Sequence, residues 1–118
     1  MPELISEPTM IPVPGGKSIA EYIGRVKTGD SEVSIAVMHA PAGWSEPAQA
    51  PAFDEFTVVI SGSIDVECEG KTTTVGAGQA LITRAGEKVR YLTREDAHYV
   101  AICVPAFAPE LANRDDDA

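Results

Sequence analysis

Short apolar and β-branched runs, interrupted by polar residues and glycine turns, make up most of this chain. These runs occupy residues 18–26, 31–40, 53–60, 63–70, 71–76, 79–84, 88–93 and 98–104. No segment before Pro105 has the apolar period of an α-helix, and residues 107–113 have room for one helical turn at most. Many short strands without helices predict an all-β sandwich or barrel.

The two ends of the chain differ from this strand-rich middle. The opening MPELISEPTMIPVPGG is rich in proline, so we expect residues 1–16 to form an extended arm along a sheet edge. We place a β-barrel at residues 17–108 and an acidic tail at residues 109–118. Within that tail, Asp115-Asp116-Asp117 is expected to be solvated and frayed.

Composition limits the cellular compartments and the binding partners that we expect for this chain. A length of 118 residues suits one domain, and a net charge of −9 at pH 7 argues against nucleic acid and anionic membranes. The chain has no long apolar span and no basic-then-apolar leader, so we expect a soluble, cytoplasmic protein. Cys68 and Cys103 lack a C-x-x-C spacing and are interpreted as small core residues of a reduced compartment.

Two groups of residues carry a recognisable spacing. The first is Gly43, Gln49, Pro51, Glu55 and Gly62, and the second is Gly78, Arg84, Gly86, Val89 and Thr93. Both groups keep the register of the two conserved motifs of cupins, and the chain resembles a small single-domain cupin over about residues 30–105. The resemblance implies a jelly-roll barrel of two antiparallel sheets.

The same comparison shows that the metal ligands are missing. In metal-binding cupins, histidines and one glutamate hold the metal, whereas this chain has Gln49, Pro51, Val89 and Glu55 at those positions. One carboxylate cannot replace several imidazole nitrogens, so we expect no metal and no other cofactor. The chain is therefore similar to cupins that lack these ligands, such as those of ethanolamine utilisation and a nucleoside-aldehyde dehydratase.

Strand alternation predicts which side chains line the barrel. If Glu55 faces inward, as the motif implies, then Phe53, Thr57 and Val59 do so as well, and Val89 similarly places Tyr91 and Thr93 inside. With Gln49 entering from the preceding loop, the pocket is a mostly apolar cup with a few polar groups, as small-molecule sites usually are. Burial should raise the pKa of Glu55 toward the range of a general acid or base. The alternative is a structural Glu55 that is hydrogen-bonded to a neighbour.

Several residues are candidates for the rim. Trp44 is interpreted as a wall of the pocket or as packing under its loop, and Lys17 as a cation for an anionic substrate or as a solvated side chain. Arg84 is a candidate clamp for a carboxylate or phosphate. Asp54 and Arg90 should face outward and form an ion pair.

The outward residues Phe56, Val58 and Ile60 are too apolar for open water, so we expect them to pack against the second sheet or against another subunit. The resemblance to cupins, which commonly dimerise, favours a homodimer. His39 and His98 are interpreted as surface or strand-end residues, with an acid/base role as the alternative.

Four functions compete. In the first, the chain is a metal-independent lyase, dehydratase or isomerase, with Glu55 and Tyr91 as catalytic residues and Gln49, Thr57 and the rim residues binding a small polar substrate. In the second, it is a sensor that binds a metabolite in the same pocket. The third is a scaffold that acts through its dimer surface, and the fourth is a metal held by Glu55 with His39 or His98.

Overall fold

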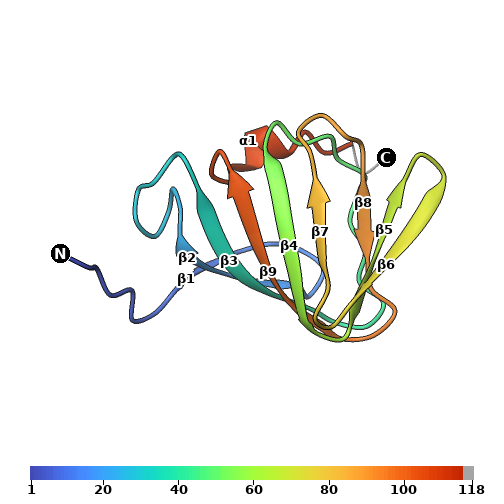
Figure 1. Ribbon diagram of the computed structural model, residues 1–118, viewed down its shortest axis with the longest axis horizontal. Helices are drawn as coiled ribbons and strands as arrows, with labels where there is room; N and C mark the ends of the chain where they lie inside the picture. The colour runs from blue at the N-terminus through green and yellow to red at the C-terminus, as the bar shows by residue number, and fades with distance from the viewer. Residues whose placement is uncertain (116–118) are drawn as a thin grey trace.

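The computed structural model describes residues 1–115, in which nine strands form two antiparallel sheets around a common interior (Figure 1). The larger sheet has the order β1-β2-β3-β9-β4-β7, and the smaller has the order β6-β5-β8. The strands are β1 Thr9–Ile11, β2 Ser18–Ile23, β3 Ser34–Ala40, β4 Asp54–Ser61, β5 Ser63–Cys68, β6 Lys71–Gly76, β7 Ala80–Thr83, β8 Arg90–Leu92 and β9 Ala97–Val104. The predicted all-β barrel is confirmed.

Side chains alternate between the interior and the surface along β4, the strand that carries the first motif. Glu55, Thr57 and Val59 are buried, whereas Val58 is exposed, and Phe53 just before the strand is buried as well. This pattern is the one that the sequence predicts, because successive residues of a strand point to opposite faces of its sheet. β4 lies between β9 and β7, so its inward residues face the middle of the barrel.

Apolar side chains from both sheets fill one part of the interior. The cluster includes Val59, Ile64, Val66 and Tyr99, all almost completely buried. Aliphatic and aromatic burial of this kind is the main favourable contribution to folding. Tyr91 and Tyr99 of this cluster also face the polar part of the interior.

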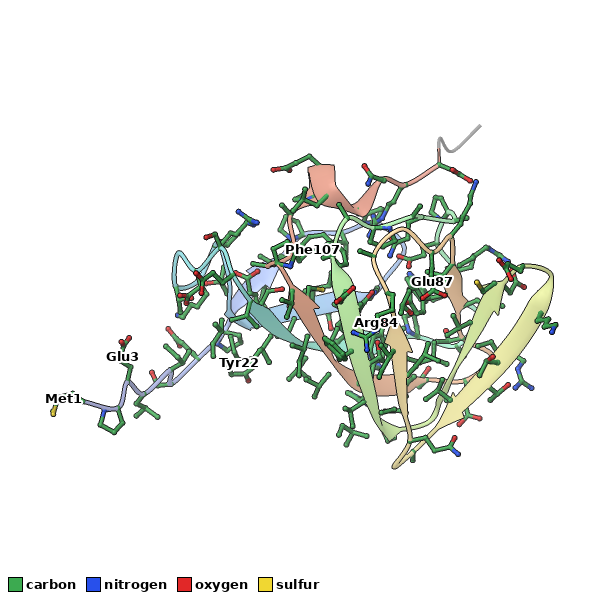
Figure 2. The ribbon with its side chains drawn as sticks, turned by 45° about the horizontal axis from the view of Figure 1, so that its top comes forward. Met1, Glu3, Tyr22, Arg84, Glu87 and Phe107 are labelled. Carbon is green, nitrogen blue, oxygen red and sulfur yellow. The ribbon has the colours of Figure 1, made fainter. Side chains whose placement is uncertain are left out.

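Segments near both ends of the described chain pack against the barrel. β1 pairs with β2 at the edge of the larger sheet, while Met1 and Glu3 extend away from the body (Figure 2). The short helix α1 (Pro109–Ala112) is the single turn that the sequence allows. It lies at one end of the barrel (Figure 1), and the backbone that follows it bonds to the loop before β4, with the Asp115 nitrogen 2.8 Å from the Ala48 oxygen.

Over its described part, the tail makes a backbone hydrogen bond and an ion pair with the body of the protein. Asp115 is half exposed and pairs with Lys88 at 2.8 Å, whereas Asp116 and Asp117 lie outside the described residues. No helix within residues 1–115 is both long and apolar enough to cross a membrane.

Candidate functional site

A small cavity lies inside the barrel beside the apolar cluster. Its volume is about 40 Å³, and its walls come mainly from the larger sheet, with Tyr91 from the smaller one. The lining residues are Ile11, Lys17, Ile19, Glu21, Ser34, Ala36, Met38, Glu46, Gln49, Phe53, Glu55, Thr57, Tyr91, Tyr99, Ala101, Cys103, Phe107 and Arg114. Four predicted polar residues, Gln49, Glu55, Thr57 and Tyr91, are thus brought together as the sequence predicts.

Glu55 lies on β4 directly between two neighbouring strands. It pairs with Thr83 of β7 on one side and with Cys103 of β9 on the other, and its side chain is buried. Burial raises the pKa of Glu55 to about 7, because the charged form loses its water, and the nearby Lys17 ammonium partly opposes this rise. Glu55 can therefore both release and accept a proton near neutral pH.

Tyr91 is the direct partner of this carboxylate. Its hydroxyl donates to Glu55 Oε1 over 3.3 Å and lies 3.0 Å from the Thr83 hydroxyl. Burial, reinforced by the negative charge of Glu55, raises the pKa of Tyr91 far above its usual value. The phenol therefore keeps its proton and acts as a hydrogen-bond donor, with Thr83 completing a short chain of hydroxyl groups.

Gln49 connects the cavity to two residues that the sequence analysis did not find. Its side-chain oxygen accepts a hydrogen bond from Arg114 Nε at 3.2 Å, and Arg114 Nη2 lies 3.5 Å from Glu46 Oε2. Burial raises the pKa of Glu46, against the effect of the Lys17 and Arg114 charges. No spacing links Glu46 or Arg114 to the motifs, because the loop and the chain end meet only in the folded protein.

Glu21 is a further buried carboxylate that lines the cavity and that the sequence analysis did not identify. Its Oε2 accepts hydrogen bonds from the backbone nitrogens of Val26 and Lys27 at 3.0 and 2.9 Å. These bonds stabilise the turn after β2, so Glu21 is part of the framework of the site. Its alternation with Ile19 in SIAEYI was the available signal, since both side chains point into the barrel.

Lys17 reaches the cavity as one of the predictions proposed. Its ammonium lies 4.4 Å from the ring centre of Trp44 and 5.5 Å from that of Tyr99, within range of cation–π attraction. Burial lowers the pKa of Lys17, while the charges of Glu46 and Glu55 oppose that change.

Trp44 is buried and lines an outer groove of about 250 Å³ instead of the inner cavity. This groove shares four residues with the cavity, namely Lys17, Ile19, Glu46 and Arg114.

The prediction that Arg84 lies at the pocket rim is wrong. Thr83 points inward at the end of β7, so the next side chain points outward, and Arg84 is exposed there (Figure 2). Arg84 pairs with Asp54 on the outside at 3.5 Å. The predicted Asp54–Arg90 pair is also wrong, because β8 belongs to the other sheet, where Arg90 pairs with Glu67 at 2.8 Å.

Both histidines lie on the outer side of the larger sheet, as the surface interpretation predicts. His39 and His98 face each other across β3 and β9, and their rings stack with centres 4.3 Å apart. Their neighbours Met38 and Tyr99 line the cavity, so the histidines point away from it. Neither histidine can act on a molecule in the cavity or join Glu55 in a metal site.

The residues present do not fit the metal centre that is common in cupins. Of the four motif positions, Val89 and Pro51 offer no side-chain donor, and the Gln49 oxygen already accepts from Arg114. Within residues 1–115 no three His, Cys, Asp or Glu side chains are grouped so that they could hold a metal ion. A transition metal prefers imidazole or thiolate ligands, so the chemistry of this site is derived from its own side chains.

Comparisons with known proteins agree with this architecture. The cupin domain family matches residues 36–105. The structure of KdgF from Halomonas sp. superposes with a TM-score of 0.71 at 16% identity, covering 84% of this chain and 89% of that one. The ethanolamine utilization protein Q of Salmonella typhimurium gives a TM-score of 0.64 at 18% identity, covering 77% and 71%. At these identities the likeness shows the fold alone.

A curated relative is more similar in sequence but much longer. Endoribonuclease YbeY of Myxococcus xanthus is 41% identical over 108 residues, which cover 88% of this chain. This chain spans only 36% of that protein's length.

Proposed function

Because this chain belongs to the cupin family, we propose that its barrel binds a small polar metabolite on which Glu55 performs proton transfer without a metal. The reaction would be that of a lyase, dehydratase or isomerase. The observation that carries this proposal is a buried carboxylate in a cavity, with a pKa of about 7 and a tyrosine as its hydrogen-bond donor. A group with a pKa near the working pH is the most effective general acid or base.

The proposed chemistry begins with ionised Glu55. Its carboxylate removes a proton from a substrate carbon next to a carbonyl, and the electron pair of the broken C–H bond moves into the carbonyl to form an enolate. Hydrogen-bond donors around the cavity stabilise the developing negative charge on oxygen. In an isomerase, Glu55 returns the proton to another carbon. In a dehydratase, it passes the proton to a departing hydroxyl group, so that water leaves and a double bond remains.

Tyr91 has two roles in this scheme. Its hydrogen bond stabilises the ionised form of Glu55 and therefore opposes the effect of burial on the pKa. The same bond, at 3.3 Å, orients the carboxylate toward the cavity that Thr57 and Phe53 also line. The apolar walls exclude water, which strengthens each of these electrostatic interactions.

The variant Glu55→Gln tests the proposal, because glutamine keeps the shape of the side chain but cannot transfer a proton. We expect the variant to fold and to bind ligands, and to lose most of the exchange of carbon-bound hydrogen with D₂O in a panel of small hydroxy and oxo compounds followed by NMR. Unchanged exchange would remove Glu55 from the mechanism. A metabolite sensor, the second candidate, would change only in affinity.

We also propose that two copies of the chain associate through the outer face of the larger sheet. Exposed apolar side chains on this face include Val58, Ile60 and Ile82. A second copy would cover them, as the solvent-exposed sheet face of a monomer is seldom this apolar.

A further inference from the structure

Lys17 is a half-buried cation that no carboxylate of residues 1–115 pairs with directly, although the charges of Glu46 and Glu55 act on it. Within residues 1–115 no carboxylate oxygen lies within 4 Å of its ammonium group, and the ring faces of Trp44 and Tyr99 hold it from the side. Long cationic side chains are seldom removed from water without a counter-ion. An anionic group supplied from outside the chain would complete this arrangement.

Arg114 provides a second cation at the same boundary. Its Nε donates to Gln49, and its Nη2 faces Glu46 at a distance of 3.5 Å. A guanidinium carries five N–H donors, so further donors remain for a ligand, and the weak contact with Glu46 is easily exchanged. Backbone bonds between the chain end and the loop before β4, such as that from Asp115 to Ala48 at 2.8 Å, position Arg114.

Both cations lie where the inner cavity meets the outer groove. Lys17 and Arg114 line the cavity of about 40 Å³ and the groove of about 250 Å³. A group the size of a water molecule needs roughly 10–15 Å³ of cavity volume. The inner cavity of about 40 Å³ therefore holds about three non-hydrogen atoms. A ligand therefore places a small organic part inside, while its charged end stays at the boundary.

We propose that Lys17 and Arg114 form a subsite for the carboxylate of a small organic acid whose organic part points into the cavity toward Glu55. Lys17 contributes a point charge, and Arg114 contributes the planar donor geometry that matches a carboxylate. The role given to Glu55 rests on the proposed function, whereas the subsite itself rests on the two cations. Besides its carboxylate, pyruvate has three non-hydrogen atoms, namely the carbonyl carbon, the carbonyl oxygen and the methyl carbon. This is the number of atoms that the inner cavity holds.

Pyruvate and its neutral amide, pyruvamide, form a matched pair of probes. Trp44 is the only tryptophan of the chain and lies beside the Lys17 ammonium, so its fluorescence should report binding. We expect pyruvate to bind at least about tenfold more tightly than pyruvamide, because the charge-assisted hydrogen bonds are lost in the amide. Equal binding of the two, or no binding of pyruvate, would overturn the subsite without any variant.

Four variants, one of them a control, assign pyruvate binding to Lys17 and Arg114. Lys17→Met and Arg114→Gln should each weaken pyruvate binding at least about tenfold and leave the weak binding of pyruvamide unchanged. Lys17→Arg, which keeps the charge, should retain most of the affinity, and Lys71→Met on the exposed strand β6 should behave like the wild type. Unchanged affinity in Lys17→Met would refute the assignment.

Inorganic phosphate tests the chemical class of the ligand. Phosphate should compete with pyruvate only weakly, because its four oxygens and larger charge do not suit a boundary that also contains Glu46. Tighter binding of phosphate than of pyruvate would overturn the carboxylate assignment.

The exchange of the pyruvate methyl hydrogens with D₂O separates the subsite from the proposed function. If pyruvate binding depends on Lys17 but Glu55→Gln exchanges at the wild-type rate, the subsite stands and proton transfer by Glu55 is wrong. If Glu55-dependent exchange is as fast with pyruvamide as with pyruvate, the proposed function stands and the carboxylate subsite is wrong.

Discussion

Replacing Glu55 by glutamine should make the protein more stable at pH 8 but not at pH 4. The native structure keeps this carboxylate away from water, and burial raises its pKa from 4.5 to about 7. Below pH 4.5 the group is protonated in the folded and in the unfolded chain, so it has little effect on stability. Between pH 4.5 and 7 the unfolded chain releases the proton first, and the free energy of unfolding therefore falls as the pH rises.

The size of the effect follows from the two pKa values. Each unit of difference corresponds to about 1.4 kcal/mol, so ionised Glu55 lowers the free energy of unfolding by about 3 kcal/mol above pH 7. Glutamine keeps an oxygen that accepts the Tyr91 hydrogen bond and carries no charge. The variant should consequently gain about 3 kcal/mol relative to the wild type at pH 8.

Urea unfolding followed by Trp44 fluorescence at several pH values between 4 and 8 measures this difference. The exposed-residue variant Glu32→Gln is the matched control and should follow the wild-type profile. If the wild type and Glu55→Gln lost stability in parallel over this pH range, burial would not raise the pKa of Glu55. The argument for proton transfer by Glu55 would then fail as well.

Three further predictions concern other parts of the molecule. Tyr91→Phe removes the hydrogen bond that stabilises ionised Glu55, so the pKa of Glu55 should rise further, which the pH dependence of its ¹³C carboxyl shift would detect; an unchanged or lower pKa would contradict the bond. Gly62→Ala should lower the free energy of unfolding, measured with urea, by about 3 kcal/mol. The reason is that Gly62 has a φ of +75° and that a Cβ there would lie 2.0 Å from the Asp96 carbonyl oxygen. An unchanged free energy of unfolding would contradict this turn geometry. Ile82→Lys on the outer face should shift the sedimentation coefficient from dimer to monomer, and an unchanged value would refute association through that face.

Much of the barrel was predictable because its signals are local. Alternation along β4 places Glu55 and Thr57 inside, and the same rule applied to β8 places Tyr91 with them. The rule also shows why Arg84 was misplaced, because the motif spacing suggested the rim while its inward neighbour Thr83 requires it to point outward. The outward direction of Asp54 was predicted correctly, but its partner was wrong because the assignment of strands to sheets was not known.

The sequence by itself determined the strands, the cupin resemblance and the inward face of the motif strand, since each depends on residues a few positions apart. Only the tertiary structure decided that Lys17, Glu46 and Arg114 meet at one boundary of the cavity. These residues come from the start, the middle and the end of the chain, and no local period relates them. The sequence predicted that the pKa of Glu55 rises, but packing decided how far, because the extent of desolvation and the charges of Lys17 and Glu46 depend on distant segments that enclose the carboxylate.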